Sequence, residues 1–306
     1  MIVELFRGSS TNTFNVEGGF TEPNGFNVFT VYLSGTIGWG LAPSHRITQR
    51  GPFQEGDSDI DFRLDPRVFS LPFVAPAYTI DAHFQLRNAL LNIFKPGNDE
   101  ASLRITYDDS YSGVQKRYID VKVIGGLTMD TDSKDFNVRG VIQLRAADPT
   151  WSAGDLEYEY QLTSTIFGTP TPYPKPYPVP YGADSVNKVT AIAYDGTWLV
   201  YPVITAVGPL TDLVITDSLN HSIKFTTPIP ASTYVSINLK YNFKTVTDQD
   251  GVNRFSWLSI DSDITNFALF PSPFVLGGGN TLSVSATGTD GASMVTINYI
   301  PRYIGV

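Results

Sequence analysis

Residues 80–95, IDAHFQLRNALLNIFK, predict an amphipathic helix in a chain whose other patterned segments are typical of strands and turns. At about 100° per residue, the apolar side chains fall on one broad arc: Ile80, Phe84, Leu86, Leu90, Leu91, Ile93 and Phe94. Thr79 is placed to cap the first turn, and Asp81 suits its positive end. Lys95 followed by Pro96-Gly97 predicts a cationic last turn and a stop. This helix therefore has a core to cover.

Two polar side chains, His83 and Arg87, project into that apolar arc. In one interpretation His83 lies at the edge and the methylene groups of Arg87 cover apolar neighbours. In the other, part of the helix face contacts another subunit, with Arg87 paired across the contact. The second interpretation makes His83, Arg87, Leu90 and Phe94 candidates for a subunit interface.

The fold class is mainly β, with an N-terminal sandwich-like domain that contains the helix. Strands are predicted on both sides of the helix, at 26–33, 61–64, 102–107, 118–124, 127–129 and 136–146. The last of these alternates like a half-buried strand, and Asp148-Pro149 ends it. Trp151 follows, where a large ring can close one end of the core.

A proline-rich segment divides the chain into two domains. Residues 168–182, GTPTPYPKPYPVPYG, place proline at every second position from 170 to 180, which favours an extended spacer or a strip docked on a neighbouring surface. We therefore predict a domain at 1–163, a linker at 164–183 and a second domain at 184–306. Strands are predicted in the second domain at 189–194, 197–206, 212–216, 222–226, 234–241, 254–260, 281–286 and 294–300. Their spacing predicts a jelly-roll or similar β-sandwich without a helix.

Composition excludes several kinds of function. The chain has 306 residues, 30 Asp and Glu against 21 Lys and Arg, a net charge of -9, and no cluster of basic residues. Specific nucleic-acid binding is therefore not expected. Cysteine is absent, which excludes disulfides, thiolate catalysis and cysteine zinc sites. The N-terminus lacks the features of a signal peptide, and no apolar stretch approaches the ~20 residues of a membrane span. We expect a soluble product made without Sec-type export or membrane insertion.

Motifs of catalysis and metal binding are weak. Residues 57–61, DSDID, resemble the start of a calcium loop, but Phe62 and Val68 replace its glycine and bidentate glutamate. Asp248 and Asp250 could bind calcium, although Asp-Gly there is also typical of a hairpin tip. Three isolated histidines, no nucleophile elbow and no phosphate loop leave no catalytic residue, metal ligand or cofactor predicted. Paired carboxylates for glycoside hydrolysis stay open, because their separation is invisible in sequence.

Trp198 and Trp257 are candidates for binding a glycan or a protein partner. Their rings could stack on sugars if they lie on an exposed sheet. In strands, however, such rings are more often part of the core.

In its order of segments the chain resembles the distal tail (Dit) proteins of siphovirus-like bacteriophages. The match lies in LRNALLNIF (86–94), LRI (103–105), RYIDV (117–121) and VIQLRAADPTW (141–151), and continues in YPVI (201–204), GPLT (208–211) and residues 267–283. It covers nearly the whole chain. The regular proline and tyrosine segment departs from the family pattern.

The resemblance implies a structural protein of the virion rather than an enzyme. Its N-terminal domain would form a hexameric ring, and its C-terminal domain would be a galectin-like sandwich. Such a ring joins the tail tube to the tail-tip hub or fibre, and anchors receptor-binding proteins or contacts host glycans. The ring would sit at the distal end of the phage tail after synthesis in the host cytoplasm, and DNA would pass through its acidic lumen without being gripped. The alternative is a carbohydrate-binding protein that attaches to the host surface through its C-terminal sandwich.

Overall fold

The structure, a computed structural model, describes residues 2–7, 10–15, 30–31, 37–75, 77–95, 103–108, 116–125, 127–130, 136–153, 162–165, 186–241, 243–271 and 279–306. The chain forms two compact units. Unit 1 contains residues 1–159 together with 303–306, and unit 2 contains residues 160–302. The expected linker at 164–183 lies outside the described residues except for 164–165, which belong to a strand of unit 2.

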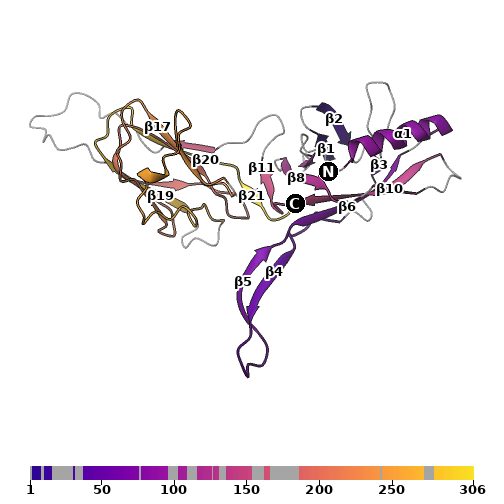
Figure 1. The fold of residues 1–306 in the computed structure, drawn as a ribbon, viewed down its shortest axis with the longest axis horizontal. Helices are drawn as coiled ribbons and strands as arrows, with labels where there is room; N and C mark the ends of the chain where they lie inside the picture. Colours follow the sequence, from indigo (N-terminus) through magenta and orange to yellow (C-terminus); the bar gives the residue numbers. More distant parts are fainter. Residues whose placement is uncertain are drawn as a thin grey trace, which may run out of the picture. The chain divides into compact units, whose positions relative to one another are not determined.

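Unit 1 is built on a sheet with the strand order β2-β1-β7-β8-β10-β6-β3, in which β11 also pairs with β8 and β9 with β10 (Figure 1). The strands are β1 Ile2–Arg7, β2 Ser10–Asn15, β3 Thr30–Val31, β6 Arg67–Ala75, β7 Leu103–Asp108, β8 Arg117–Val123, β9 Thr128–Asp130, β10 Val138–Ala146 and β11 Trp151–Ala153. Alternate residues of β6 and β10 are buried, which the sequence pattern predicted for β10 only. The predicted strands that fall in described residues of this domain are therefore present.

The core of unit 1 gathers around Trp151, which is fully buried just after the Asp148-Pro149 stop. Its indole stacks on Trp39, with ring centroids 5.9 Å apart, and meets the edge of Phe69 at 5.8 Å. Asp148 stabilises the turn before Trp151, because its carboxylate accepts hydrogen bonds from the amide and hydroxyl of Thr150. The tryptophan thus closes the core at the place where its sequence position predicts.

The helix α1 spans Ile80–Ile93, and Thr79 caps it by accepting a hydrogen bond from the Ala82 amide at 3.1 Å. It packs on the sheet through a row of buried side chains that joins the core, namely Leu86, Leu90 and Phe94. Phe94 serves as the C-cap, so Lys95 lies beyond the helix and the last turn carries no basic residue. The expected cationic last turn is wrong for that reason.

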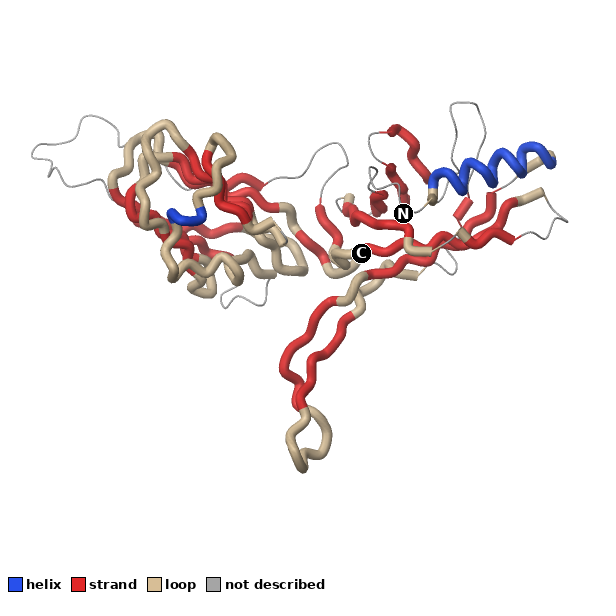
Figure 2. The backbone as a smooth tube through the Cα atoms, viewed as in Figure 1, coloured by secondary structure: helices blue, strands red, loops and turns tan. Residues whose placement is uncertain are grey.

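A long hairpin projects from unit 1 and is formed by β4 (Ser44–Gln49) and β5 (Ser58–Leu64) (Figures 1 and 2). We call it the arm. Residues 58–61, which belong to the DSDID motif that resembles the start of a calcium loop, lie within β5 itself. The arm leaves the body of the unit at Ala42 and returns at Asp65, whose amide donates a hydrogen bond to the Pro43 carbonyl.

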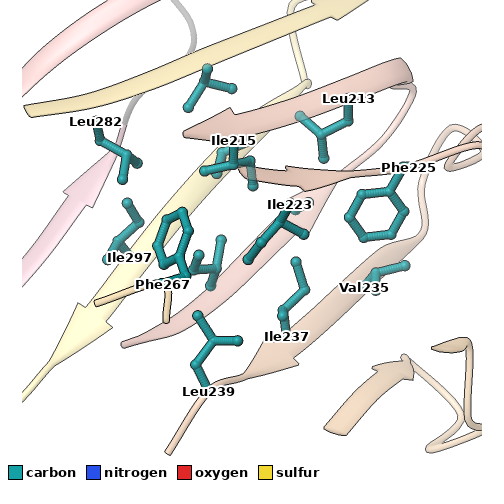
Figure 3. Close-up of a cluster of buried hydrophobic side chains, with 14 of the residues drawn as sticks. Leu213, Ile215, Ile223, Phe225, Val235, Ile237, Leu239, Phe267, Leu282 and Ile297 are labelled. Atoms are coloured by element: carbon teal, nitrogen blue, oxygen red, sulfur yellow. The ribbon is translucent and has the colours of Figure 1, made fainter. Parts of the chain in front are cut away.

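Unit 2 is a sandwich of two sheets. One sheet has the order β12-β20-β14-β17-β18, and the other has the order β13-β19-β15-β16. Their bounds are β12 Leu162–Thr165, β13 Val186–Ile192, β14 Val203–Val207, β15 Thr211–Thr216, β16 Ser222–Lys224, β17 Tyr234–Asn238, β18 Thr245–Asp248, β19 Asn280–Thr287 and β20 Met294–Tyr299. Figure 3 shows Leu213, Ile215 and Ile223 of one sheet facing Val235, Ile237 and Ile297 of the other. The predicted β-sandwich is confirmed.

One predicted strand of unit 2 is wrong. Residues 254–260 form a short 3-10 helix, η1 (Phe255–Trp257), followed by turns. The side chain of Asn253 accepts a hydrogen bond from the Phe255 amide at 2.9 Å, which stabilises the turn before a strand can form. Alternation of apolar and polar residues could not reveal this local competition.

After unit 2 the chain returns to unit 1 through its last residues, beginning in β21 (Arg302–Tyr303), which pairs with β11. Tyr303 is 6% exposed and belongs to the core of unit 1. We call residues 303–306 the tail. Unit 1 is therefore assembled from both ends of the chain.

Candidate subunit-contact surfaces

The apolar arc of α1 is divided between the core and the solvent. Leu86, Leu90 and Phe94 point inward, whereas Ile80, Phe84 and Leu91 are 59%, 54% and 44% exposed. Positions 80, 84, 87 and 91 share one stripe of an α-helix, about 90° from the stripe of positions 86, 90 and 94. The helix thus buries one edge of its apolar face in its own unit and leaves the other edge open.

His83 and Arg87 occupy different places relative to these stripes. The Nδ1 atom of His83 lies 2.8 Å from the carbonyl oxygen of Phe136, so the imidazole ties α1 to the connection before β10. The imidazole also meets the ring of Phe84 edge-on at 5.6 Å. Arg87 is half-buried and lies on the exposed stripe. His83 thus has a partner within its own chain, and Arg87 lies beside the exposed side chains of Phe84 and Leu91.

Leu90 and Phe94 do not lie on the open stripe. They are 0% and 3% exposed and form part of the core of unit 1. The sequence pattern placed them on the apolar arc but could not divide that arc. The apolar side chains of α1 that remain open to a contact are therefore Ile80, Phe84 and Leu91. They belong to the predicted arc but were not among the expected interface residues.

The arm is the second uncovered surface. Both of its strands are exposed along their length, with only Ile47 and Leu64 partly covered. Ile60 and Phe62, which share a face of β5, are 60% and 45% exposed. An isolated two-stranded hairpin is marginally stable in water. Covering its apolar side chains with another protein surface would stabilise it.

The tip of the arm presents Phe53, whose side chain is fully exposed and whose φ is +67°. Hydrogen bonds within the turn hold this conformation: Gln54 accepts from the Gly51 amide through its side chain and donates to Ser58 Oγ at 2.8 Å. A positive φ is unusual for an aromatic residue, and such strained conformations cluster at functional sites.

Trp198 and Trp257 are both half-buried and lie in separate segments of unit 2. Trp198 donates its backbone amide to the Arg302 carbonyl at 3.0 Å. Trp257 packs against the core, and the Arg254 guanidinium lies 4.8 Å from its ring centroid. Arg254 therefore occupies one face of this indole, which a stacked sugar would otherwise use.

The acidic motifs hold turns in the described residues. Asp248 accepts hydrogen bonds from Arg254 Nε at 2.7 Å and from the Val252 and Asp250 amides. Desolvation opposes ionisation of this carboxyl, but the hydrogen bonds and the charge of Arg254 outweigh it and lower its pKa. Asp248 thus stabilises the hairpin tip at Gly251, and among the described residues no group of three or more acidic or histidine side chains could hold a metal ion.

A buried carboxylate next to a histidine also serves a turn. Asp217 is 5% exposed, and its Oδ2 atom lies 2.7 Å from His221 Nδ1. Its Oδ1 atom accepts hydrogen bonds from the Leu219 and His221 amides, both at 2.9 Å. These contacts close the connection between β15 and β16, so the pair is built into the sandwich as a structural turn.

Within the described part of the chain, no helix is both long and apolar enough to cross a membrane. No protein-family model matches the sequence, and no curated protein matches it.

Solved structures do match the fold. The Dit protein (gp 19.1) of phage SPP1, described as a paradigm of the hub adsorption apparatus in phages that infect Gram-positive bacteria, superposes with a TM-score of 0.65 at 11% identity over 99% of both chains. Two chains of the phage p2 baseplate in its activated conformation, with Sr and with Ca, give TM-scores of 0.43 and 0.41 at 14% and 12% identity. They cover 97% and 95% of this chain, and 97% and 98% of the baseplate chains. The superposition on the SPP1 Dit protein shows that the chain has a Dit-like fold, as the sequence resemblance predicted.

Proposed function

We propose that this protein is a structural component of a phage tail tip, in which six copies of unit 1 close into a ring. The observation that carries the proposal is the pair of uncovered apolar surfaces on unit 1, the α1 stripe and the arm. A monomer gains nothing from exposing Ile80 and Phe84 on a helix that already has a core. The Dit-like fold supports the choice of a tail-tip ring over other oligomers.

The two surfaces favour a head-to-tail arrangement. They lie on different elements and differ in chemistry, so the arm of one copy can meet the helix of the next, and repetition of such a contact closes a ring when the rotation permits. The arm carries exposed Asp57 and Asp61 beside its apolar side chains, and the helix stripe carries Arg87. Complete burial of an exposed Ile, Leu or Phe side chain contributes about 1.5–3 kcal/mol. The apolar contacts would supply affinity, and the charges would fix the register.

In this role the ring connects the tail tube to the hub or fibre at the distal end of the tail, and it anchors receptor-binding proteins or contacts host glycans. Its function is structural and not catalytic. The net charge of -9 per chain suits a lumen through which DNA moves without being held. Unit 2, as a separate sandwich, is the part available for partners other than the neighbouring copies.

The test uses two complementary full-length variants. Phe84→Asp disables the helix stripe and leaves the arm intact, and Phe62→Asp disables the arm and leaves the stripe intact. The unmodified chain should form hexamers at high concentration in native mass spectrometry, alone or with tube protein, and each variant should stay monomeric. A mixture of the two variants retains one good interface and should give dimers that cannot close.

Val189→Asp is the matched control, because Val189 is 64% exposed on a strand of unit 2. It should still form hexamers. A chain that stays monomeric with and without tube protein would refute the ring. Symmetric dimers of the unmodified chain would refute the head-to-tail contact.

A further inference from the structure

The tail, residues 303–306, completes unit 1 after the whole of unit 2 has been made. Residues 160–302 separate it in sequence from the rest of the unit. Because synthesis runs from the N-terminus, the tail becomes available only after unit 2 has been made. The core of unit 1 thus contains a piece that earlier chain lengths lack.

Two arginines hold the backbone of the tail. Arg67 is 1% exposed and donates a hydrogen bond from Nη2 to the Ile304 carbonyl at 2.7 Å. Arg117 donates from Nη1 to the Gly305 carbonyl at 3.0 Å. The tail also exchanges backbone hydrogen bonds with unit 1, since Ala42 donates to Ile304 and Val306 donates to Trp39.

Arg67 links the tail to two other segments of unit 1. Its Nε donates to the Pro149 carbonyl at 3.0 Å, and its Nη1 donates to the Gly38 and Gly40 carbonyls at 2.5 and 2.6 Å. Burial lowers the pKa of this guanidinium, and its N–H groups donate to backbone carbonyl oxygens. A buried cation depends on having its donors satisfied. Loss of the Ile304 carbonyl therefore disturbs the site that also fixes the root of the arm and the Asp148-Pro149 turn.

The side chains of the tail fit closely. The Tyr303 ring is buried in the core, and the Arg117 guanidinium carbon lies 3.8 Å from its centroid. At Gly305 an added Cβ would lie 3.0 Å from the Gly40 carbonyl oxygen, so the two backbones approach closely. The tail therefore packs closely against the rest of unit 1.

We infer that the tail is a folding latch: unit 1 completes its fold only when Arg67 and Arg117 bind residues 303–306. Only then do the α1 stripe and the arm become competent to assemble. Chains that stop before the tail would then be excluded from the ring, because they fold unit 2 without completing unit 1. The effect on folding stands on the tail contacts alone. The effect on assembly rests on the proposed ring.

The test compares the full chain with a chain ending at Arg302, by hydrogen exchange read separately in each unit. Exchange in β10 should accelerate by about a hundredfold or more when two hydrogen bonds to charged groups are lost. Exchange in β14 and β17 of unit 2 should stay unchanged. Unchanged β10 exchange would overturn the inference, and so would equal acceleration in both units.

Full-length substitutions decide the matter if the shortened chain aggregates. Tyr303→Ala removes a buried ring and should accelerate β10 exchange, whereas Ile304→Ala keeps the carbonyl that Arg67 binds and should change it little. Equal behaviour of this pair would overturn the inference. The two proposals can be refuted separately. If the full chain stays monomeric while β10 exchange depends on residues 303–306, only the ring is refuted. If β10 exchange does not depend on residues 303–306, only the latch is refuted.

Discussion

Units 1 and 2 are both β-rich, but they differ in where their exposed apolar side chains lie. In unit 2 the two sheets bury their inner faces against each other, and the most exposed large apolar side chains, Ile260 and Tyr241, lie in turns, while Val189 on β13 is 64% exposed. In unit 1 exposed apolar residues recur on regular elements, with Ile80 and Phe84 on α1 and Ile60 and Phe62 on β5. Unit 2 is complete as a sandwich, and unit 1 has surfaces that suit further association. This difference supports the proposal that unit 1 carries the assembly surfaces.

The largest expected effects come from emptying the two cores. Trp151→Ala should destabilise unit 1 and Phe267→Ala should destabilise unit 2, each by about 3–5 kcal/mol, because both rings are fully buried. Chemical denaturation followed by hydrogen exchange in each unit would measure this. If either substitution unfolds both units to the same extent, the two are not the independent structures that the comparison assumes.

A neighbouring pair on α1 separates folding from assembly. Leu90→Ala removes a fully buried side chain and should cost unit 1 about 2–5 kcal/mol. Leu91→Ala should change stability by less than about 0.5 kcal/mol, because Leu91 is 44% exposed. Native mass spectrometry of Leu91→Ala should nevertheless show fewer hexamers. An equal loss of stability in both variants would contradict the division of the helix face.

The start of α1 provides a smaller effect. Thr79→Ala removes the acceptor of the Ala82 amide and should destabilise unit 1 by about 1 kcal/mol. Thr79→Ser keeps a hydroxyl and serves as the control. Thermal unfolding of the two variants should differ, and identical midpoints would show that the cap contributes nothing.

The smallest effect is a pH dependence in unit 2. The pKa of Asp248 is lowered in the folded chain, so its contribution to stability is present above the ordinary carboxyl pKa and is lost as the pH falls through the lowered value. NMR titration of the Asp248 carboxyl should show this lowered pKa, and Arg254→Ala should raise it. An unchanged pKa in that variant would remove Arg254 as the cause.

Sequence patterns predicted the elements better than their environments. Period-2 alternation in β10 and the cap at Thr79 were sufficient to place these elements, because they depend on neighbouring residues alone. The strand predicted at 254–260 failed where the Asn253 side chain competes for a backbone amide. The sequence placed Leu90 and Phe94 on the apolar arc correctly. The interface prediction needed them exposed, whereas the structure buries them in the core of unit 1.

The sequence by itself determined the β-rich fold class, the single amphipathic helix among the described elements, and the stop before Trp151, since periodicity, capping and proline act within a few residues. Only the tertiary structure decided which half of the helix face is buried, that the arm is uncovered, and that the tail returns to Arg67. These features depend on contacts between residues far apart in the chain, such as Arg67 and Ile304. No local pattern encodes which distant carbonyl a buried guanidinium will meet.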